Sequence, residues 1–511
     1  MTLSDTLAAG ATASLATLGL LSSYIWLNDR KIVPRPPPIG QLDLQPITKE
    51  EVEDALRRMD EREEEMRRQM PPKTGRRYIV VGGGGSLGGW IVVHLLQRGE
   101  DPKSIRVIDL APTPMNETIS EAIKNDGLDY ISTSITDPEA TREAFCAPWK
   151  DGKLGAATGI TVFHTAAAIR FFEQHQTFLR RSSIVNVDGT RNVLEASKIT
   201  GVDVLVYTSS AGVSYKNFSS LRWPWEGPPR ELYQHINEDT VGPRNPAEHT
   251  SNYSITKTAA ERMVRGWDRT PVTDGSSGTK LLRTGCIRAG NAVFGPRGGT
   301  FVEGYLDRES TPTWTSNVVS SFLYVENGAL AHLLYERRLL DLKEPTPAGR
   351  ARTLPDIGGK SFCITDPGPP ACYSDLYITF NTLTKGRVKF GHTSPTLMLL
   401  LAHLIRFYVL FQYIVTAFFP FLKGVLRPLQ GDIAFLQPSA FTASLGHIII
   451  DDSRARKSPE EGGLGYEGVW TTWQGFVKTW KDHEERKQLK TGGKKVSQAS
   501  GWLGSGASWE K

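Results

Sequence analysis

The stretch RYIVVGGGGSLGGWIVVHLLQRG, residues 77–99, decides the fold of this chain. Its opening residues are rich in β-branched side chains, which favour a strand, and from Ser86 onward the apolar residues follow helical spacing. Between the two runs, Gly82, Gly85 and Gly88 form a G-x-x-G-x-x-G pattern. A strand, a glycine-rich turn and a helix in this order predict a βαβ unit whose turn can hold a phosphate group at the helix N-terminus.

Strand and helix continue to alternate beyond this unit. Further strands are predicted at 104–110, 161–167, 204–210 and 285–295, with helical runs such as 187–201 between them. Hairpin signals are few, and strands that alternate with helices form a parallel sheet with helices on both faces. The predicted fold class is therefore α/β, a doubly wound parallel sheet of the Rossmann type. From residue 296 onward the alternation weakens.

Composition excludes several classes of protein. The 511 residues include 39% hydrophobic and 23% charged residues, which is typical of a globular chain. The net charge of +5 is small for this length, and no arginine and lysine stripe with interleaved aromatic residues is present, so no nucleic acid partner is expected. The 4 cysteines have neither a disulfide framework nor zinc-site spacing, so no metal is predicted and a reducing compartment is indicated.

The N-terminal region carries a membrane signal. Residues 7–27 contain no charged residue, and as a helix they would reach ~30 Å, about one hydrocarbon thickness. Arg30, Lys31 and Arg35 follow, which places the bulk of the chain in the cytosol by the positive-inside rule. A signal peptide would need basic residues before the apolar run, and residues 1–5 have none. We favour a membrane anchor, with a signal peptide or a non-spanning helix as alternatives.

A second apolar segment lies at residues 396–424. It carries His403, Arg406 and Gln412 in its middle, where a charged side chain disfavours insertion across a bilayer. We therefore expect one or two helices lying in the membrane interface, apolar face down. A buried core helix and a second true span are the alternatives.

These signals divide the chain into segments. Residues 47–70, within the linker, have many Glu/Arg pairs at helical spacing and are predicted to form a solvated spacer helix. The predicted segments are a membrane anchor (1–30), a proline-rich and charged helical linker (31–75), a Rossmann domain (76–300), a substrate-binding region (301–392), a hydrophobic membrane-associated segment (393–426), a C-terminal helical region (427–491) and a disordered tail (492–511).

Asp109 ends the second predicted strand, where a dinucleotide's ribose would lie. A carboxylate there can accept both ribose hydroxyls and would repel a 2′-phosphate. No arginine or lysine follows it directly, where a cation could pair with such a phosphate. The sequence therefore predicts NAD, rather than NADP, as the cofactor.

A reaction centre is predicted from Ser210, Tyr253 and Lys257. Ser210 ends a parallel strand, at the edge where ligands bind in such sheets. Lys257 lies one helical turn after Tyr253 on the same face, where a cation can stabilise the phenolate of a residue with an ordinary pKa of ~10. Ser210 can donate a hydrogen bond to a substrate oxygen, and Ser209 is the alternative.

The motifs together resemble the extended short-chain dehydrogenases/reductases. Over roughly residues 76–335 the branch they resemble is the 3β-hydroxysteroid dehydrogenase family, including sterol-4α-carboxylate 3-dehydrogenases. The motifs that carry the resemblance are GGGGSLGG, HTAAAIRF, NVDGTRNVLEAS, YTSSAGV, YSITK and IRAGNAVFGPRGG.

The resemblance implies roles for individual residues. Tyr253 would be the catalytic acid/base, Lys257 would bind the nicotinamide ribose and depress the Tyr253 pKa, and Ser210 would position the substrate oxygen. Asn186 would order a helix and a proton-relay water. The implied cofactor-binding residues are Gly82, Gly85, Leu87, Gly88, Asp109, Ala166, Ala167, Tyr253 and Lys257.

The resemblance also implies a function: oxidation of a 3β-hydroxyl on a steroid or sterol-like substrate, with loss of CO2 where a 4-carboxyl is present. The expected partners are a lipophilic small molecule and the membrane of the endoplasmic reticulum, with the catalytic domain facing the cytosol. A homodimer is a further possibility left open. A terpenoid, polyketide or nucleotide-sugar substrate and a non-catalytic dinucleotide-binding scaffold are the alternatives. One departure is a long interval between Ser210 and Tyr253, whose aromatic residues and prolines at 221–239 indicate a lid, a substrate wall or a surface insertion.

Overall fold

The computed structural model describes residues 3–44, 46–152, 159–273, 280–298, 300–342 and 354–492. Its centre is a seven-stranded sheet in which every neighbouring pair is parallel. In spatial order the strands are β14 (Ser361–Ile364), β9 (Arg283–Ala289), β5 (Val204–Ser210), β4 (Ile160–His164), β1 (Arg77–Val81), β2 (Ile105–Asp109) and β3 (Asp129–Ser132). The predicted Rossmann-type parallel sheet is confirmed.

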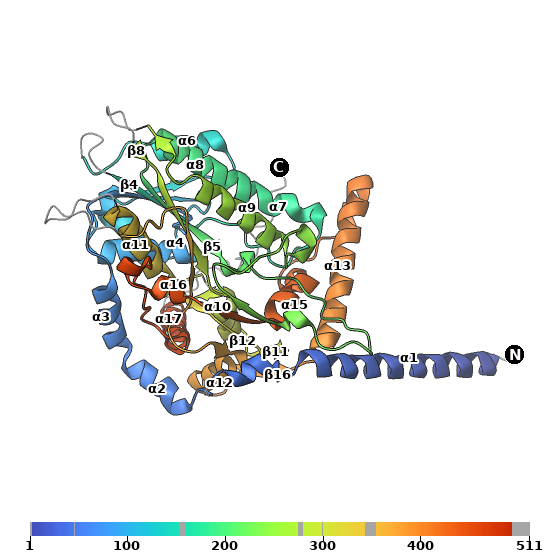
Figure 1. Cartoon of the computed structure of the whole chain (residues 1–511). Helices are drawn as coiled ribbons and strands as arrows, with labels where there is room; N and C mark the ends of the chain where they lie inside the picture. The colour runs from blue at the N-terminus through green and yellow to red at the C-terminus, as the bar shows by residue number, and fades with distance from the viewer. Residues whose placement is uncertain are drawn as a thin grey trace.

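Helices cover both faces of this sheet because its strands bury alternate side chains on opposite sides (Figure 1). Tyr78 and Val80 of β1 pack in one core with helices that lie on that face, α4 (Ser86–Gln97), α5 (Glu117–Asn125) and α11 (Val325–Asp341). Ile79 and Val81 pack in another core with α6 (Pro138–Cys146), α8 (Thr190–Ile199) and α9 (Asn252–Gly266).

The order of the strands creates the place for a ligand. Strand β1 has β2 on one side and β4 on the other, so the chain leaves β1 and β4 in opposite directions. In open parallel sheets this divergence leaves a crevice at the carboxyl ends of the strands, which is where ligands bind. The turn after β1 and residues 165–168 after β4 lie at this crevice.

The seven-stranded sheet also includes a strand from beyond residue 300, namely β14 at 361–364. A smaller four-stranded sheet joins segments that are far apart in sequence: β15 (Ala371–Cys372), β12 (Val319–Ser320), β17 (His447–Ile450) and β6 (Tyr233–Ile236). Around it lie α10 (Thr300–Asp307), α12 (Tyr373–Leu383), α15 (Pro438–Leu445) and α17 (Thr472–Gly492).

The linker before β1 is not a solvated spacer. It forms two helices, α2 (Lys49–Arg57) and α3 (Met59–Gln69), and Val52, Met59 and Met66 are buried in a core shared with α12 and α17. The prediction of a solvated helix was wrong because these three apolar residues, spaced seven apart, lie on one helical face that the core covers.

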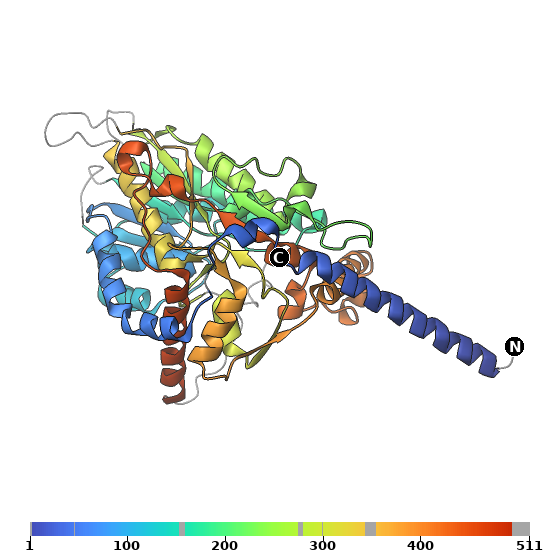
Figure 2. The same cartoon turned by 60° about the horizontal axis from the view of Figure 1, so that its bottom comes forward.

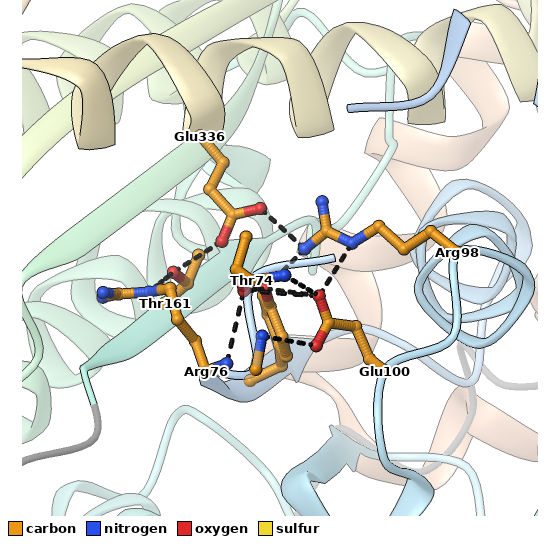
Figure 3. Close-up of polar contacts among 8 residues, drawn as sticks. Thr74, Arg76, Arg98, Glu100, Thr161 and Glu336 are labelled. Carbon is orange, nitrogen blue, oxygen red and sulfur yellow. Dashed lines mark hydrogen bonds and ion pairs between the residues drawn. The ribbon is translucent and has the colours of Figure 1, made fainter. Parts of the chain in front are cut away.

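A buried polar network joins Thr74, at the end of the linker, to β4, to α11 and to the residues just after α4 (Figure 3). The guanidinium of Arg98 lies 3.0 Å from carboxylate oxygens of both Glu100 and Glu336, and its side chain is only 2% exposed. Thr161 of β4 donates to Glu336 at 2.8 Å, and the backbone N–H of Thr74 donates to Glu100 at 2.8 Å. One arginine thus neutralises two buried carboxylates.

Two helices within the described ranges are long and apolar enough to cross a membrane, judged by length and composition only: α1 (Leu3–Ile32) and α13 (Pro395–Phe418). In Figures 1 and 2, α1 projects away from the body of the molecule. Helix α13 lies against the body and crosses the base of α1. The predicted disordered tail lies outside the described residues except for Gly492, which ends α17.

Candidate active site

The glycine turn occupies residues 82–85, between the end of β1 and the start of α4. Gly82 has φ of +83°, a conformation that favours glycine, and a Cβ there would lie 2.6 Å from the backbone nitrogen of Ala166. A Cβ on Gly88 would lie 2.2 Å from the carbonyl oxygen of Gly82. The turn therefore packs directly on α4 and on the segment after β4, and its backbone is open to a ligand only because side chains are absent.

Replacing Gly88 by alanine should destabilise this turn, whereas Gly85→Ala should not. The new methyl group at 88 would overlap the Gly82 carbonyl, and overpacking of this kind costs about 1–3 kcal/mol. At Gly85 the closest contact would be 3.4 Å, an ordinary van der Waals distance. Thermal unfolding of the two variants checks the difference. Equal midpoints would contradict the close packing of Gly88 on Gly82.

Two predicted cofactor residues differ in what their side chains contact. Asp109 lies beside the turn, where its carboxylate accepts from the backbone N–H of Gly84 at 3.0 Å and of Ala111 at 2.9 Å. Burial raises the pKa of Asp109, and these backbone donors act against the rise. The side chain of Leu87 instead packs towards Gly328 of α11 and is half-buried.

Helix α9 brings Tyr253 to the carboxyl end of β5. Ser251 caps the helix by accepting from the backbone N–H of Ser254, which places Tyr253 in the first turn. Burial raises the pKa of Tyr253 to about 12, and the neighbouring Ser210 hydroxyl acts against this rise. The structure therefore brings the predicted serine and tyrosine together at the ligand edge of the sheet.

Lys257 is one turn further along α9 and points into the protein. Its side chain is 1% exposed, and its ammonium donates to the Tyr207 hydroxyl at 2.7 Å and to the Thr208 carbonyl at 2.5 Å. It also lies 4.1 Å from the centre of the Tyr207 ring, a cation–π distance. The expected depression of the Tyr253 pKa by Lys257 is not seen in this arrangement, because the ammonium is held by Tyr207 and Thr208.

Burial lowers the pKa of Lys257 to about 7, with Cys286 and Glu261 acting in the opposite direction. In the unfolded chain the same group keeps its proton up to its ordinary pKa of 10.5. Between these values the unfolded state binds more protons, so folding becomes more favourable as the pH rises. Relative to Lys257→Met, the wild type should gain free energy of unfolding between about pH 7 and 10.5. Denaturant unfolding at several pH values checks this, and a pH-independent difference would refute it.

Ser209 and Ser210 have separate surroundings. The Ser209 hydroxyl donates to the Glu261 carboxylate at 2.5 Å, and Glu261 is also paired with the Arg288 guanidinium at 2.7 Å. Ser209 is 2% exposed, whereas Ser210 is half-buried beside Tyr253. Ser209 is thus occupied by a buried ion pair, and Ser210 is the serine available to a ligand.

Asn186 lies in a π-helical stretch, Ile184–Gly189, at the start of the helix that continues as α8. Its side chain accepts from the backbone N–H of Ala168 at 2.7 Å and donates to the Thr256 hydroxyl at 3.0 Å. It therefore ties the segment after β4, which contains the predicted residues Ala166 and Ala167, to α9. Single-turn π-helices often occur at functional sites.

Sequence reasoning did not assign roles to Tyr207 and Thr208, which hold Lys257, or to Glu261 and Arg288. Strand periodicity was the available signal, because Tyr207 and Ser209 are two residues apart and both face α9. A cavity of about 460 Å³ lies along α9 next to Glu261 and Arg288, but none of the predicted catalytic residues lines it.

Comparison with known proteins places this site in a family. Residues 79–387 match the 3-beta hydroxysteroid dehydrogenase/isomerase family, over more than half of the chain. The chain belongs to this family. The family resemblance predicted from the sequence is confirmed, and with it membership of a family of NAD(P)-binding oxidoreductases.

Two curated relatives are named as 3β-hydroxysteroid or sterol dehydrogenases. A 3beta-hydroxysteroid-dehydrogenase/decarboxylase (isoform 2) of Arabidopsis thaliana is 30% identical over 246 residues, which are 46% of this chain and 36% of that protein. A decarboxylating sterol-4-alpha-carboxylate 3-dehydrogenase of Saccharomyces cerevisiae is 27% identical over 291 residues, covering 55% of this chain and 69% of that protein. The chain covers only 36% to 52% of the length of three curated relatives: the two Arabidopsis thaliana isoforms and a sterol-4-alpha-carboxylate 3-dehydrogenase of Candida albicans.

Solved structures confirm the fold alone. A UDP-glucose-4-epimerase of Stenotrophomonas maltophila with bound NAD has a TM-score of 0.51 at 17% identity, covering 81% of this chain and 99% of that one. An epimerase of Methanothermobacter thermautotrophicus also has a TM-score of 0.51, at 15% identity, covering 84% of this chain and 97% of that one.

Proposed function

We propose that this protein is an NAD-dependent dehydrogenase that oxidises the 3β-hydroxyl of a steroid or sterol-like substrate to the ketone. The observation that carries the proposal is the meeting of Ser210 and Tyr253 at the ligand edge of the sheet, in a chain of the 3-beta hydroxysteroid dehydrogenase/isomerase family. Where the substrate has a 4-carboxyl, the product is a β-keto acid, which loses CO2 readily.

The proposed chemistry uses three side chains. Ser210 donates a hydrogen bond to the substrate oxygen, and Tyr253 accepts the hydroxyl proton. Because burial raises the pKa of Tyr253 to about 12, its phenolate needs a nearby positive charge at neutral pH. Lys257 of α9 is the buried cation that supplies this charge. To do so, its ammonium must break its hydrogen bonds to Tyr207 and Thr208. A bound nicotinamide cofactor supplies the hydride acceptor.

The glycine turn fits a dinucleotide, since Gly82 and Gly88 leave space that a Cβ would fill. We propose that the turn holds the pyrophosphate and that Asp109 accepts the ribose hydroxyls, which favours NAD over NADP. Asp109→Asn should then raise the dissociation constant for NAD at least tenfold, because charged acceptors bind hydroxyls more strongly than amides. Asp126→Asn, at the exposed end of α5, is the control. Unchanged NAD affinity in the Asp109 variant, measured by calorimetry, would contradict the assignment.

A lipophilic substrate is supported by apolar side chains next to the site. Ile169 and Phe171 follow directly after the segment held by Asn186 and remain 59% and 41% exposed. Beside them, Phe172 meets Phe435 with ring centroids 4.5 Å apart, and Phe178 meets Tyr413 of α13 at 5.2 Å. The segment predicted to lie at the membrane, which contains Tyr413, thus borders the residues that follow β4.

The membrane part of the proposal rests on α1 and α13. Exposed apolar residues run along α13, including Leu404 at 67%, Phe407 at 68% and Phe418 at 76%. We propose that α1 spans a membrane, that of the endoplasmic reticulum, and that α13 lies in its cytosolic interface. The catalytic domain then faces the cytosol, because Arg30 and Lys31 lie in the last turn of α1 and Arg35 follows it. We also propose the segment division given above, from the anchor to the C-terminal helical region, except that β14 at 361–364 belongs to the Rossmann sheet.

An assay with the purified full-length protein tests the function. NAD reduction is measured with a panel of 3β-hydroxysterols, with and without a 4-carboxyl, and CO2 release is measured alongside. We expect turnover with at least one of these sterols. Turnover only with a terpenoid or another non-steroidal alcohol would overturn the substrate class. NAD binding without turnover of any alcohol would favour a non-catalytic scaffold.

A further inference from the structure

A loop between Ser210 and Tyr253 exposes two tryptophans. This tryptophan loop, residues 219–227, carries Trp223 and Trp225, whose side chains are 64% and 79% exposed. Their rings stack on each other with centroids 5.2 Å apart and an interplanar angle of 8°. Two adjacent exposed indoles form an apolar surface with polar N–H groups, which is the kind of surface that membrane interfaces favour.

The tryptophan loop is fixed to the base of α1 by hydrogen bonds at several positions. The Lys31 ammonium donates to the carbonyls of Trp223 and Pro224, at 2.7 and 3.0 Å. The buried side chain of Asn28 donates to the Ser220 carbonyl at 3.0 Å and accepts from the Arg222 N–H at 2.9 Å. Asn28 also donates to the Thr396 hydroxyl of α13 at 2.7 Å. The loop, α1 and α13 are therefore held in one fixed arrangement.

The loop also runs along α1 towards its apolar part. Glu226 lies close enough to Tyr24 for an electrostatic interaction, while Lys31 holds the backbone of the same loop. Along a helix, Tyr24 and Lys31 are about 10 Å apart. The loop thus flanks the last two turns of α1, where Tyr24 and Trp26 end the uncharged stretch and Arg30 lies 4.7 Å over the Trp26 ring.

We propose that the tryptophan loop inserts into the headgroup region of the lipid bilayer that α1 spans. Trp223 and Trp225 lie beside the segment of α1 that holds Tyr24 and Trp26, so a bilayer spanned by the preceding residues of α1 brings its interface to the loop. A single spanning helix leaves the body free to rotate about the helix axis. A second contact, rigidly joined to the first, removes this freedom and holds α13 against the same surface. The inference rests on the membrane part of the proposed function.

A fluorescent probe at residue 225 tests the depth of the loop. The exposed Cys146 is first replaced by serine, which leaves three buried cysteines. Full-length protein with Trp225→Cys is labelled with a nitrobenzoxadiazole probe and reconstituted in phosphatidylcholine vesicles. Ile199→Cys, a similarly apolar and exposed position (48%) at the end of α8, is the matched control. Quenching is measured with lipids that carry a spin label near the headgroup or near the bilayer centre.

We expect the probe at 225 to shift to shorter emission wavelength in vesicles and to be quenched several-fold more by the shallow spin label than by the deep one. The probe at 199 should behave as in water. If the protein floats with vesicles but the probe at 225 also behaves as in water, the loop proposal is wrong and the anchor stands. If the protein does not float with vesicles, the membrane part of the proposed function falls as well. Shielding of the probe without vesicles would assign the loop to contact with a second copy of the chain, which overturns the proposal.

Discussion

Replacing Tyr253 by phenylalanine should lower kcat by ~10²–10⁴-fold, the range that a positioned proton-transfer group contributes. The substitution removes only the hydroxyl, so the ring keeps its place in the first turn of α9. NAD affinity should fall far less than kcat, because the glycine turn and Asp109 are untouched and only the contact of the Tyr253 hydroxyl with the cofactor is lost. Steady-state kinetics with a turned-over sterol and calorimetry with NAD separate the two effects.

Tyr233→Phe serves as the matched control for this experiment. Tyr233 lies within the interval 221–239, but it is half-buried in β6 and pairs with β17 of the smaller sheet, so it belongs to the framework of that sheet and not to a lid. It should retain full activity. If Tyr253→Phe behaved like this control, Tyr253 would not be the proton-transfer group, and the proposed mechanism would have to be given up.

Replacing Arg98 by methionine should lower the free energy of unfolding by about 3–5 kcal/mol, the cost of removing one partner of a buried ion pair. Arg98 lies between Glu100 and Glu336 (Figure 3), and all three side chains are at most 2% exposed. Without the guanidinium, the two buried carboxylates would lose the cation that pairs directly with both of them. Denaturant unfolding followed by circular dichroism measures the loss.

Arg180→Met is the comparison for Arg98→Met. Arg180 pairs with Asp188 at 2.6 Å, but its side chain is 71% exposed, and exposed pairs contribute little to stability. We expect its unfolding midpoint to match the wild type. A similar small change at Arg98 would mean that water reaches the network, contrary to its burial.

The parts of the fold predicted from the sequence are those with strong local signals. The unit from β1 to β2 is confirmed because a β-branched strand, a glycine turn and an amphipathic helix occur within one short stretch. Strand β14 was missed, since four residues at 361–364 show no periodicity of their own and depend on pairing with β9. The linker helices were misjudged for a similar reason: their charges are visible in the sequence, but the core that covers Val52, Met59 and Met66 is not.

The sequence by itself determined the glycine turn, the residues that end the strands and the spacing of Tyr253 and Lys257, because each depends on residues within a few helical turns or one strand. Only the tertiary structure decided which serine is available and where the lysine points. Ser209 is held by Glu261, and Lys257 is held by Tyr207 and Thr208. These partners come from elements about fifty residues apart, and burial makes their pairing obligatory.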